Sequence, residues 1–228
     1  MIRTKLRLNQ KVAVQRALEH DGFALFGEMR TGKSLTALAV ADARKPDLLV
    51  VVSNKKGTRV WRGQIKEHLK IDWPCQKILV HYESLCRQAK ERRWWRYRFR
   101  HTWADKTIML IVDEGHRIKR LGSMQSRMVR SLGKLSDWRL LLSGTPGHKA
   151  RRDAYAIFDF VMPGAFGDEF EDFQDMYLEM GGYKDREVIG TKNDERFERI
   201  FHKFRHRITL REAQGEAGRK PYRVVRKR

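Results

Sequence analysis

Short apolar runs recur along the first two thirds of the chain, and polar or glycine-containing segments separate them. The runs occupy residues 23–26, 48–52, 78–80, 107–112 and 138–142. Those at 48–52 and 107–112 are continuous rather than alternating, which is typical of strands buried on both faces of a parallel sheet. Apolar positions three or four residues apart predict helices over 8–18, 61–69 and 124–132, with Asn9 and Thr58 as candidate N-caps of the first two. The pattern predicts an α/β fold with a mainly parallel sheet.

The pattern changes after residue 150, where apolar residues follow helical spacing and alternate with charged ones. Phe170, Phe173 and Tyr177 are one such set, and residues 197–204 contain another. The glycines at 181, 182 and 190 are expected to break the helices. We therefore expect an α/β lobe over residues 1–150, a helical extension over 151–210 that packs on the same lobe, and a basic tail over 211–228.

A glycine-bounded loop stands between the first predicted strand and the helix that follows it. Residues 27–34 read Gly-Glu-Met-Arg-Thr-Gly-Lys-Ser, which matches the spacing G-x-x-x-x-G-K-S without a mismatch. The two glycines let the backbone bend sharply and bring its N–H groups close to an anion, and the helix N-terminus adds free amides and a positive dipole end. A turn that binds nothing is the alternative, and the flanking strand and helix argue against it.

This loop predicts a nucleotide-binding site. Lys33 is expected to reach the β- and γ-phosphates of ATP, and the Ser34 hydroxyl is expected to ligate Mg²⁺. Gln10 lies at the start of a predicted helix, and its carboxamide could both donate to and accept from the edge of adenine. By itself it would more often be a solvated helix residue. The full predicted set of nucleotide contacts is Gln10, Gly27, Glu28, Met29, Arg30, Thr31, Gly32, Lys33, Ser34 and Leu35.

Two further polar turns follow buried strands. Asp113 and Glu114 end the strand at 107–112, where Asp113 can hold Mg²⁺ and Glu114 can orient and deprotonate the attacking water. His116 would sense the γ-phosphate. Ser143 and Thr145 follow the strand at 138–142, and their hydroxyls can form hydrogen bonds that differ between nucleotide states. We therefore predict Lys33, Asp113 and Glu114 to be catalytic, and His116, Ser143 and Thr145 to couple the site to a partner.

The charge balance points to a polyanionic partner. The chain carries 49 Lys and Arg against 28 Asp and Glu, a net charge of +21, and such an excess favours nucleic acid. Lys55, Lys56 and Arg59 follow the strand at 48–52 in a predicted loop, where contact with a phosphate backbone and simple solvation are the alternatives. The turn after Tyr82 is a further candidate. Arginines interleave with aromatic residues over 87–103, which suits either single-strand binding or docking on the core.

Other features narrow the cellular setting. Cys75 and Cys86 form no CxxC pair and suit reduced thiols of an intracellular protein. No secretory apolar segment follows the basic N-terminus, and no run approaches the length of a membrane span. We therefore expect a cytoplasmic protein that does not act at a membrane.

The order of these motifs resembles the first RecA-like motor lobe of superfamily 2 helicases. Gln10 and residues 27–34, 48–56, 113–116 and 143–146 are similar to the Q motif and motifs I, Ia, II and III, in that order. The SWI/SNF-like translocases of duplex DNA are the most similar branch: HYESL at 81–85 resembles their SYE-x-L, and DEGHRIK at 113–119 resembles their DEAHRIK of DEAH-box type. The similarity covers most of residues 3–210 and departs from the usual alanine at Gly115.

The resemblance implies a three-layer RecA-like P-loop NTPase lobe that uses ATP and Mg²⁺, hydrolyses ATP and acts on duplex DNA. The family's second lobe is not found after the turn at 204–208. Relatives supply arginines from that lobe across the nucleotide, and such charge compensation is worth about 10³–10⁵ in rate. Weak hydrolysis is therefore expected, with the second lobe on a separate polypeptide, as in a compact viral or phage genome, or lost by truncation.

Two rival functions remain open from the sequence. One is a DNA- or partner-binding module that responds to ATP without turnover, which the missing lobe favours. The other is a different P-loop NTPase, such as a clamp-loader-like ATPase or a small-molecule kinase. The turn at 143–146 and His116 argue against the second rival.

Overall fold

A six-stranded parallel sheet forms the centre of the protein. The computed structural model describes residues 1–90, 102–144, 151–183 and 187–215. The strand order is β3-β2-β4-β5-β1-β8. The strands span Gly22–Gly27 (β1), Leu48–Ser53 (β2), Gln76–His81 (β3), Ile108–Val112 (β4), Trp138–Ser143 (β5) and Arg205–Ile208 (β8). The five apolar runs of the sequence correspond to β1 to β5, and the predicted parallel sheet is confirmed.

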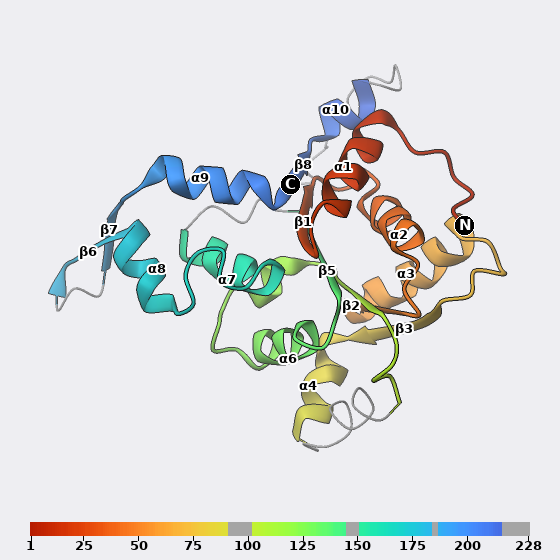
Figure 1. Ribbon diagram of the computed structural model, residues 1–228, viewed down its shortest axis with the longest axis horizontal. Helices are drawn as coiled ribbons and strands as arrows, with labels where there is room; N and C mark the ends of the chain where they lie inside the picture. The colour runs from red at the N-terminus through yellow and green to blue at the C-terminus, as the bar shows by residue number, and fades with distance from the viewer. Residues whose placement is uncertain (91–101, 145–150, 184–186, 216–228) are drawn as a thin grey trace, which may run out of the picture.

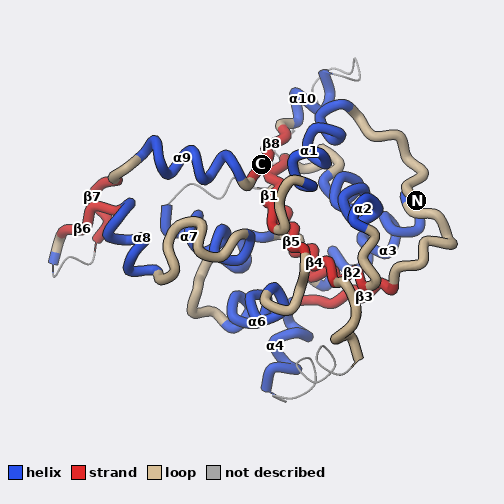
Figure 2. Tube along the Cα trace, in the orientation of Figure 1, coloured by secondary structure: helices blue, strands red, loops and turns tan. Residues whose placement is uncertain are grey.

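Helices cover both faces of the sheet (Figure 1, Figure 2). One layer contains α1 (Leu8–Leu18), α2 (Lys33–Arg44) and α3 (Lys55–His68), which pack on one set of alternating strand residues, including Leu49, Val51 and Ile111. The other contains α4 (Tyr82–Lys90), α6 (Met124–Gly133) and α7 (Arg151–Val161), which pack on the intervening residues, including Val50 and Leu110. Because successive side chains of a strand point to opposite faces, the continuous apolar runs supply both cores. The three-layer RecA-like architecture is thus confirmed.

The segment after residue 150 is only partly helical. It supplies α7, α8 (Phe170–Tyr177), α9 (Asp194–Lys203) and α10 (Leu210–Gly215), as the extension was expected to. It also supplies an antiparallel hairpin of β6 (Leu178–Gly181) and β7 (Glu187–Thr191), which lies at the far end of the molecule in Figure 1. Gly190 lies in β7, so it belongs to a strand and does not break a helix. The segment then returns to the main sheet, where β8 pairs in parallel with β1 and Ala24 lies opposite Arg205.

A cluster of aromatic rings fills the core of this segment and reaches the sheet, where Phe26 of β1 stacks on Phe201 with ring centroids 6.2 Å apart. Phe166 stacks on Phe197 with ring centroids 5.0 Å apart, and Phe173 lies 5.2 Å from Tyr177. Phe158 of α7 stacks on Phe201 of α9 at 5.0 Å. All of these rings are buried. Phe173 and Tyr177 of the helically spaced set belong to this cluster, whereas Phe170 is only half-buried at its edge.

Two helix starts differ from the sequence prediction. α1 begins at Leu8 with Arg7 as its N-cap, so Asn9 lies inside the helix. α3 begins at Lys55, and its N-cap is Asn54, whose side-chain oxygen accepts a hydrogen bond from the Gly57 N–H at 2.6 Å. Thr58 therefore lies inside α3, and its prediction as the cap was wrong. The Asn54 oxygen satisfies one of the free amides of the first turn.

Some predictions concern residues outside the described part of the chain. These are Thr145, most of the arginine-rich and aromatic segment (91–101), and the tail beyond residue 215. Among the described residues, no helix combines the length and the apolar character that crossing a membrane requires.

The aromatic cluster predicts where the fold is most sensitive. Phe173 is 0% exposed and contacts Phe166, Tyr155 and Tyr177. We expect Phe173→Ala to lower the free energy of unfolding by about 3–5 kcal/mol, because it removes buried ring surface and leaves a cavity. Ile71 is 94% exposed and provides the control. Ile71→Ala should change the free energy of unfolding by less than about 0.5 kcal/mol. Urea unfolding monitored by circular dichroism measures both, and equal effects would contradict the packing described here.

Candidate nucleotide-binding site

The ends of three neighbouring strands define the candidate site. β4, β5 and β1 are adjacent and parallel, so their carboxyl ends lie at one edge of the sheet. Ser143 lies opposite Phe26, and Val112 lies opposite Leu141. The loop after β1, the acidic pair after β4 and Ser143 are therefore brought together, as the sequence predicted for the edge of a parallel sheet.

The loop after β1 has the conformation expected of a phosphate-binding loop. It runs from Gly27, the last residue of β1, to Gly32, the left-handed N-cap of α2 with φ 84°. Arg30 also has a positive φ, 67°. The Thr31 hydroxyl donates to the Glu28 carbonyl at 2.8 Å, and a Cβ on Gly27 would lie 2.7 Å from the Thr31 oxygen. The loop is therefore too tight for a side chain at Gly27.

Lys33 sits at the inner side of this loop. Its Nζ donates to the carbonyls of Gly27 at 2.6 Å and Glu28 at 3.0 Å. Burial lowers the pKa of the Lys33 ammonium, while the charges of Asp113 and Glu114 act in the opposite direction. The structure thus places Lys33 within electrostatic reach of the acidic pair. Ser34 follows it in the first turn of α2 and is half-buried.

The remaining loop residues differ in exposure. Glu28, Met29 and Arg30 are exposed, whereas Leu35 packs in the core. Glu28 also ties the loop to the C-terminal segment: its N–H donates to the Ile208 carbonyl at 3.2 Å, and its Oε2 accepts from the Leu210 N–H at 3.1 Å. The sequence analysis placed residues 204–208 in a turn. The segment 205–208 contains one apolar residue, so the hydrophobic pattern carried no signal for a strand beside the phosphate loop.

Gln10 of α1 binds the carbonyl groups of the phosphate loop. Its side chain is 3% exposed, its Oε1 accepts from the Arg7 N–H at 3.0 Å, and its Nε2 donates to the Thr31 carbonyl at 3.4 Å. A Cβ on Gly32 would lie 2.3 Å from Gln10 Nε2. A cavity of about 240 Å³ opens beside these groups, and it is lined by Thr4, Lys5, Arg7, Gln10, Arg30, Gly32, Leu35, Gln64 and His68. Readout of a base by Gln10 stays a prediction.

The carboxylate of Asp113 is held by donors from another element and from its own turn. Trp61 Nε1 of α3 donates to Asp113 Oδ2 at 2.9 Å, and the Glu114 N–H donates to Oδ1 at 2.9 Å. The Tyr82 hydroxyl of α4 donates to the Asp113 carbonyl at 2.7 Å. Trp61 and Tyr82 are buried. Burial, and then the charge of Asp113, raise the pKa of Tyr82 well above its usual value, so its hydroxyl remains a donor.

Sequence reasoning missed the roles of these two aromatic residues. Trp61 was predicted only as part of the apolar face of a helix, and Tyr82 only as part of the segment that ends a strand. Their ring donors could have raised the question of a partner, since a buried indole N–H or phenol usually has one. The partner itself could not be found, because Trp61 and Asp113 are 52 residues apart in the chain.

Glu114 lies at a strained backbone position. It has a positive φ of 54° and precedes the short 3₁₀ helix η1 (Gly115–Ile118). Its Oε2 lies 3.4 Å from His116 Nδ1, and both side chains are substantially exposed to solvent. A Cβ on Gly115 would lie 2.4 Å from the buried Leu141 side chain of β5. The glycine that replaces the family's usual alanine thus permits a close approach of the acidic turn to β5.

The donor set suits magnesium together with a polyphosphate. In the described part of the chain, no group of three or more His, Cys, Asp or Glu side chains could hold a metal ion. Mg²⁺ is usually bound through one or two carboxylates plus the phosphates of a substrate, and Asp113 with the Ser34 hydroxyl offers that oxygen chemistry. Each Asp113 oxygen retains lone-pair capacity beyond the single hydrogen bond described for it.

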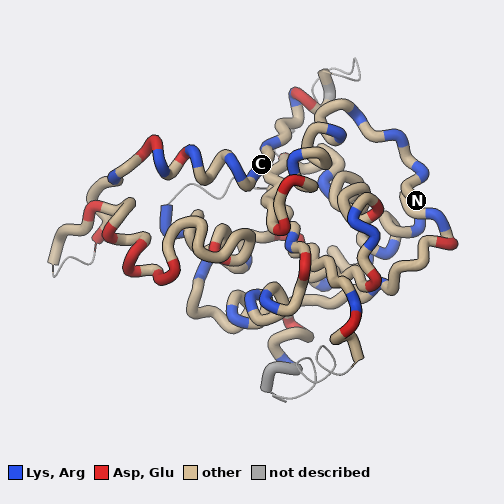
Figure 3. Tube along the Cα trace, viewed as in Figure 1, with Lys and Arg blue, Asp and Glu red and all other residues tan. Residues whose placement is uncertain are grey.

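The candidate nucleic-acid contacts lie on a helix rather than in a loop. Lys55, Lys56 and Arg59 are exposed residues in the first two turns of α3, and the loop prediction for them was wrong. Likewise, α4 begins at Tyr82, so no turn follows it. Figure 3 shows that lysines and arginines are spread over both helical layers, interrupted by acidic residues. The position of α3 after β2 places its first turn at the same sheet edge as the phosphate loop.

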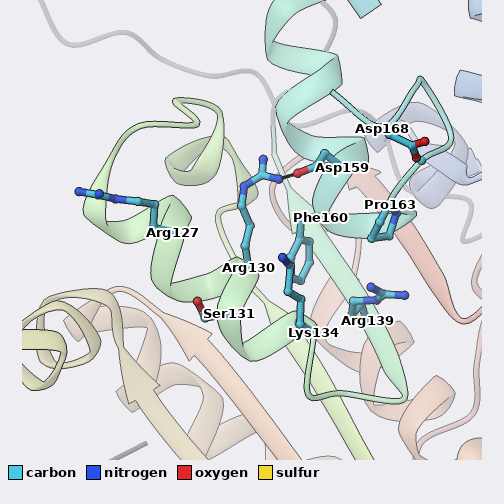
Figure 4. Close-up of a pocket in the computed structure, with 11 residues that line it drawn as sticks. Arg127, Arg130, Ser131, Lys134, Arg139, Asp159, Phe160, Pro163 and Asp168 are labelled. Atoms are coloured by element: carbon cyan, nitrogen blue, oxygen red, sulfur yellow. Dashed lines mark ion pairs between the residues drawn. The ribbon is translucent and has the colours of Figure 1, made fainter. Parts of the chain in front are cut away.

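A second cavity, of about 550 Å³, lies at the opposite edge of the sheet (Figure 4). Arg139 near the start of β5 lines it, together with residues from the end of α6 and the end of α7. Arg130 points toward Asp159 and forms an ion pair with it, and burial lowers the Arg130 pKa to about 10. None of the residues predicted for the nucleotide site lines this cavity.

Known proteins resemble this chain in sequence. The family model described as the SNF2-related domain matches residues 43–217, a range that begins after the phosphate loop. The chromodomain-helicase-DNA-binding protein 1-like of Danio rerio is 26% identical over 125 residues, 54% of this chain and 11% of that protein. The ISWI chromatin-remodeling complex ATPase ISW2 of Saccharomyces cerevisiae is 27% identical over 146 residues, 63% of this chain and 12% of that protein. The chain spans about a tenth of the length of these relatives.

Solved structures share the fold. The Sulfolobus solfataricus SWI2/SNF2 ATPase core, solved in complex with dsDNA, superposes with a TM-score of 0.67 at 21% identity, over 91% of this chain and 45% of that one. The Pyrococcus furiosus Hef helicase domain superposes with a TM-score of 0.53 at 11% identity, over 77% of this chain and 41% of that one. The likeness at these identities concerns the fold.

The loop geometry predicts a marked effect of one methyl group. We expect Gly32→Ala to weaken nucleotide binding at least tenfold, because the residue is left-handed and its Cβ would lie 2.3 Å from Gln10 Nε2. Gly63→Ala in α3 is the control, since its Cβ meets nothing within 4 Å, and it should leave the affinity unchanged. Titration with a fluorescent ATP analogue measures both, and equal affinities for the two variants would contradict the role assigned to the loop.

Proposed function

The chain belongs to the SNF2-related domain family, and on that premise we propose that it is the ATP-binding lobe of an ATP-dependent DNA translocase or helicase. The observation that carries the proposal is the meeting of the phosphate loop and the acidic pair at one edge of the sheet, with Lys33 within electrostatic reach of both carboxylates. The ATPase and helicase names of the relatives support the same function.

Each residue of the site has a role in this proposal. Lys33 and the amides of the loop bind the phosphates of ATP, and Ser34 and Asp113 hold Mg²⁺. The ion, when bound, neutralises charge on the β- and γ-phosphates. Glu114 accepts a proton from the water that attacks the γ-phosphate. Gln10 and the cavity beside it receive the base, whereas His116, Ser143 and Thr145 relay the state of the γ-phosphate.

Duplex DNA is the proposed partner. The first turns of α3 present Lys55, Lys56 and Arg59 to solvent at the sheet edge that carries the nucleotide site. The net charge of +21 favours a polyanion, and the related SWI2/SNF2 ATPase core was solved with dsDNA. The protein is proposed to act in the cytoplasm.

Hydrolysis is proposed to need a second lobe. The chain spans 45% of the related ATPase core, and arginines supplied across a nucleotide accelerate phosphoryl transfer about 10³–10⁵-fold. A second RecA-like lobe, on further chain or on a separate polypeptide, would complete the site. Without it, the lobe is an ATP-responsive DNA-binding module with little turnover, which is the alternative function.

Two substitutions separate binding from chemistry. Lys33→Ala should weaken ATP·Mg²⁺ binding at least tenfold, because it removes the cation that contacts the phosphates. Glu114→Gln should keep the affinity within about threefold and abolish hydrolysis, because the amide cannot accept the proton. Nucleotide titration and a phosphate-release assay, each with and without duplex DNA, measure these effects. Absence of ATP binding by the unaltered chain would overturn the proposed function, and binding without hydrolysis in every condition would favour the alternative.

The DNA contacts are tested through salt dependence. Replacing Lys55 and Lys56 by alanine should weaken duplex binding and lower the slope of log affinity against log salt by about 1 for each phosphate that is no longer neutralised. Lys134→Ala is a matched control, because Lys134 lines the cavity at the opposite sheet edge. Fluorescence anisotropy with a labelled duplex at several salt concentrations gives the slopes. Equal slopes for both variants would exclude α3 from the interface.

A further inference from the structure

One helix contacts both the acidic turn and the cavity beside the phosphate loop. α3 carries exposed Lys55, Lys56 and Arg59 in its first two turns, Trp61 in its middle, and Gln64 and His68 toward its end. We propose that α3 links contact with a DNA phosphate backbone to the position of the Asp113 carboxylate, with Trp61 as the positioning residue. This inference rests on the proposed function, and it identifies how DNA and ATP·Mg²⁺ would regulate each other's binding.

The hydrogen bond from Trp61 fixes the orientation of the carboxylate. The indole is 1% exposed and packs in the core between α3 and the sheet. An indole N–H can only donate, so Asp113 Oδ2, 2.9 Å away, has to face it. The bond to Oδ1 comes from the neighbouring Glu114 N–H and moves with the turn itself. Trp61 is therefore the side-chain donor through which a separate helix sets the direction of this carboxylate.

The basic turn and Trp61 are joined by a short rigid segment. Lys55 and Trp61 are six residues apart, which is about 9 Å along a helix axis. The start of α3 is fastened to the end of β2, since Asn54 caps Gly57 and Ser53 Oγ lies 3.2 Å from Thr58 Oγ1. β2 is the direct neighbour of β4, whose end carries Asp113. A small sliding of α3 against the sheet would therefore change the geometry between Trp61 and Asp113.

The far end of α3 contacts the segment that supports the phosphate loop. His68 Nδ1 lies 2.8 Å from Thr4 Oγ1, and the Arg3 N–H donates to the His68 carbonyl at 2.7 Å. Gln64 and His68 line the cavity beside Gln10 and Gly32. Displacement of α3 thus reaches both the metal-holding carboxylate and the nucleotide cavity through contacts of one helix.

Linkage makes the inference quantitative. If DNA raises the affinity for ATP·Mg²⁺ by some factor, ATP·Mg²⁺ must raise the affinity for DNA by the same factor, and such factors are on the order of 5 to 150. We expect the unaltered chain to fall in that range. Trp61→Phe keeps an aromatic ring and loses the donor, so the factor should fall to about 1, while DNA affinity without nucleotide stays within about twofold.

The experiment compares dissociation constants for ATP with and without a labelled duplex, and for the duplex with and without ATP·Mg²⁺. Trp73→Phe is the matched control, because Trp73 is a buried tryptophan in the same layer that contacts Lys77 and not the acidic pair. A magnesium titration at fixed ATP adds a readout that a change in packing would not move. In Trp61→Phe its midpoint should rise about tenfold, whereas binding of ATP without Mg²⁺ should be unchanged.

The outcomes distinguish this inference from the proposed function. An unaltered chain that binds both ligands independently, or a Trp61→Phe variant that retains the coupling, overturns the inference and leaves the proposed function intact. An unaltered chain that binds neither ligand overturns the proposed function itself. If Trp61→Phe does not fold, Asn54→Ala decides, because it removes the side-chain cap that fixes the basic turn of α3 and leaves Trp61 in place. Coupling unchanged in Asn54→Ala would reject the helix as the link.

Discussion

The charge of Asp113, at the end of a fully buried strand, is the constraint on which the site depends. This carboxylate is half-buried and its hydrogen-bond donors come from Trp61 of α3 and from the following backbone N–H, while the Tyr82 hydroxyl of α4 donates to the carbonyl of the same residue. Elements from both helical layers therefore converge on one residue after β4. The arrangement holds the acidic turn beside the phosphate loop, and it also makes the turn sensitive to the placement of α3.

The phosphate loop is stabilised in a comparable way from several sides. Gln10 of α1 bonds to its carbonyl groups from behind, and Glu28 joins it to β8 and α10. β8 in turn follows α9, whose aromatic residues pack with those of α7 and α8. The segment after residue 150 is thus part of the lobe's structure, and its strand β8 holds the candidate phosphate loop through the hydrogen bonds of Glu28. Looser packing in the aromatic cluster would therefore displace β8 and, with it, the phosphate loop.

Glycines mark the places where the site is packed most closely. Gly32 accommodates Gln10 beside a left-handed backbone, and Gly115 accommodates Leu141 of β5. In both cases the neighbouring residue comes from another element, so the absence of a side chain is a requirement of tertiary packing. The second cavity, at the opposite edge, is lined instead by an ion pair between the half-buried Arg130 and Asp159.

The sequence by itself determined five of the six strands of the main sheet, the phosphate loop and the acidic pair. These are contiguous features: a buried parallel strand is a short apolar run, and the loop needs fixed residue types at fixed spacing. Tertiary structure alone decided that β8 flanks the loop and that Trp61 and Tyr82 hold Asp113. The reason is physical. β8 has a single apolar residue and is stabilised by pairing with β1, and the bonds to Asp113 join residues 52 and 31 positions apart. Contacts between residues so far apart in the chain cannot be predicted from a local sequence pattern.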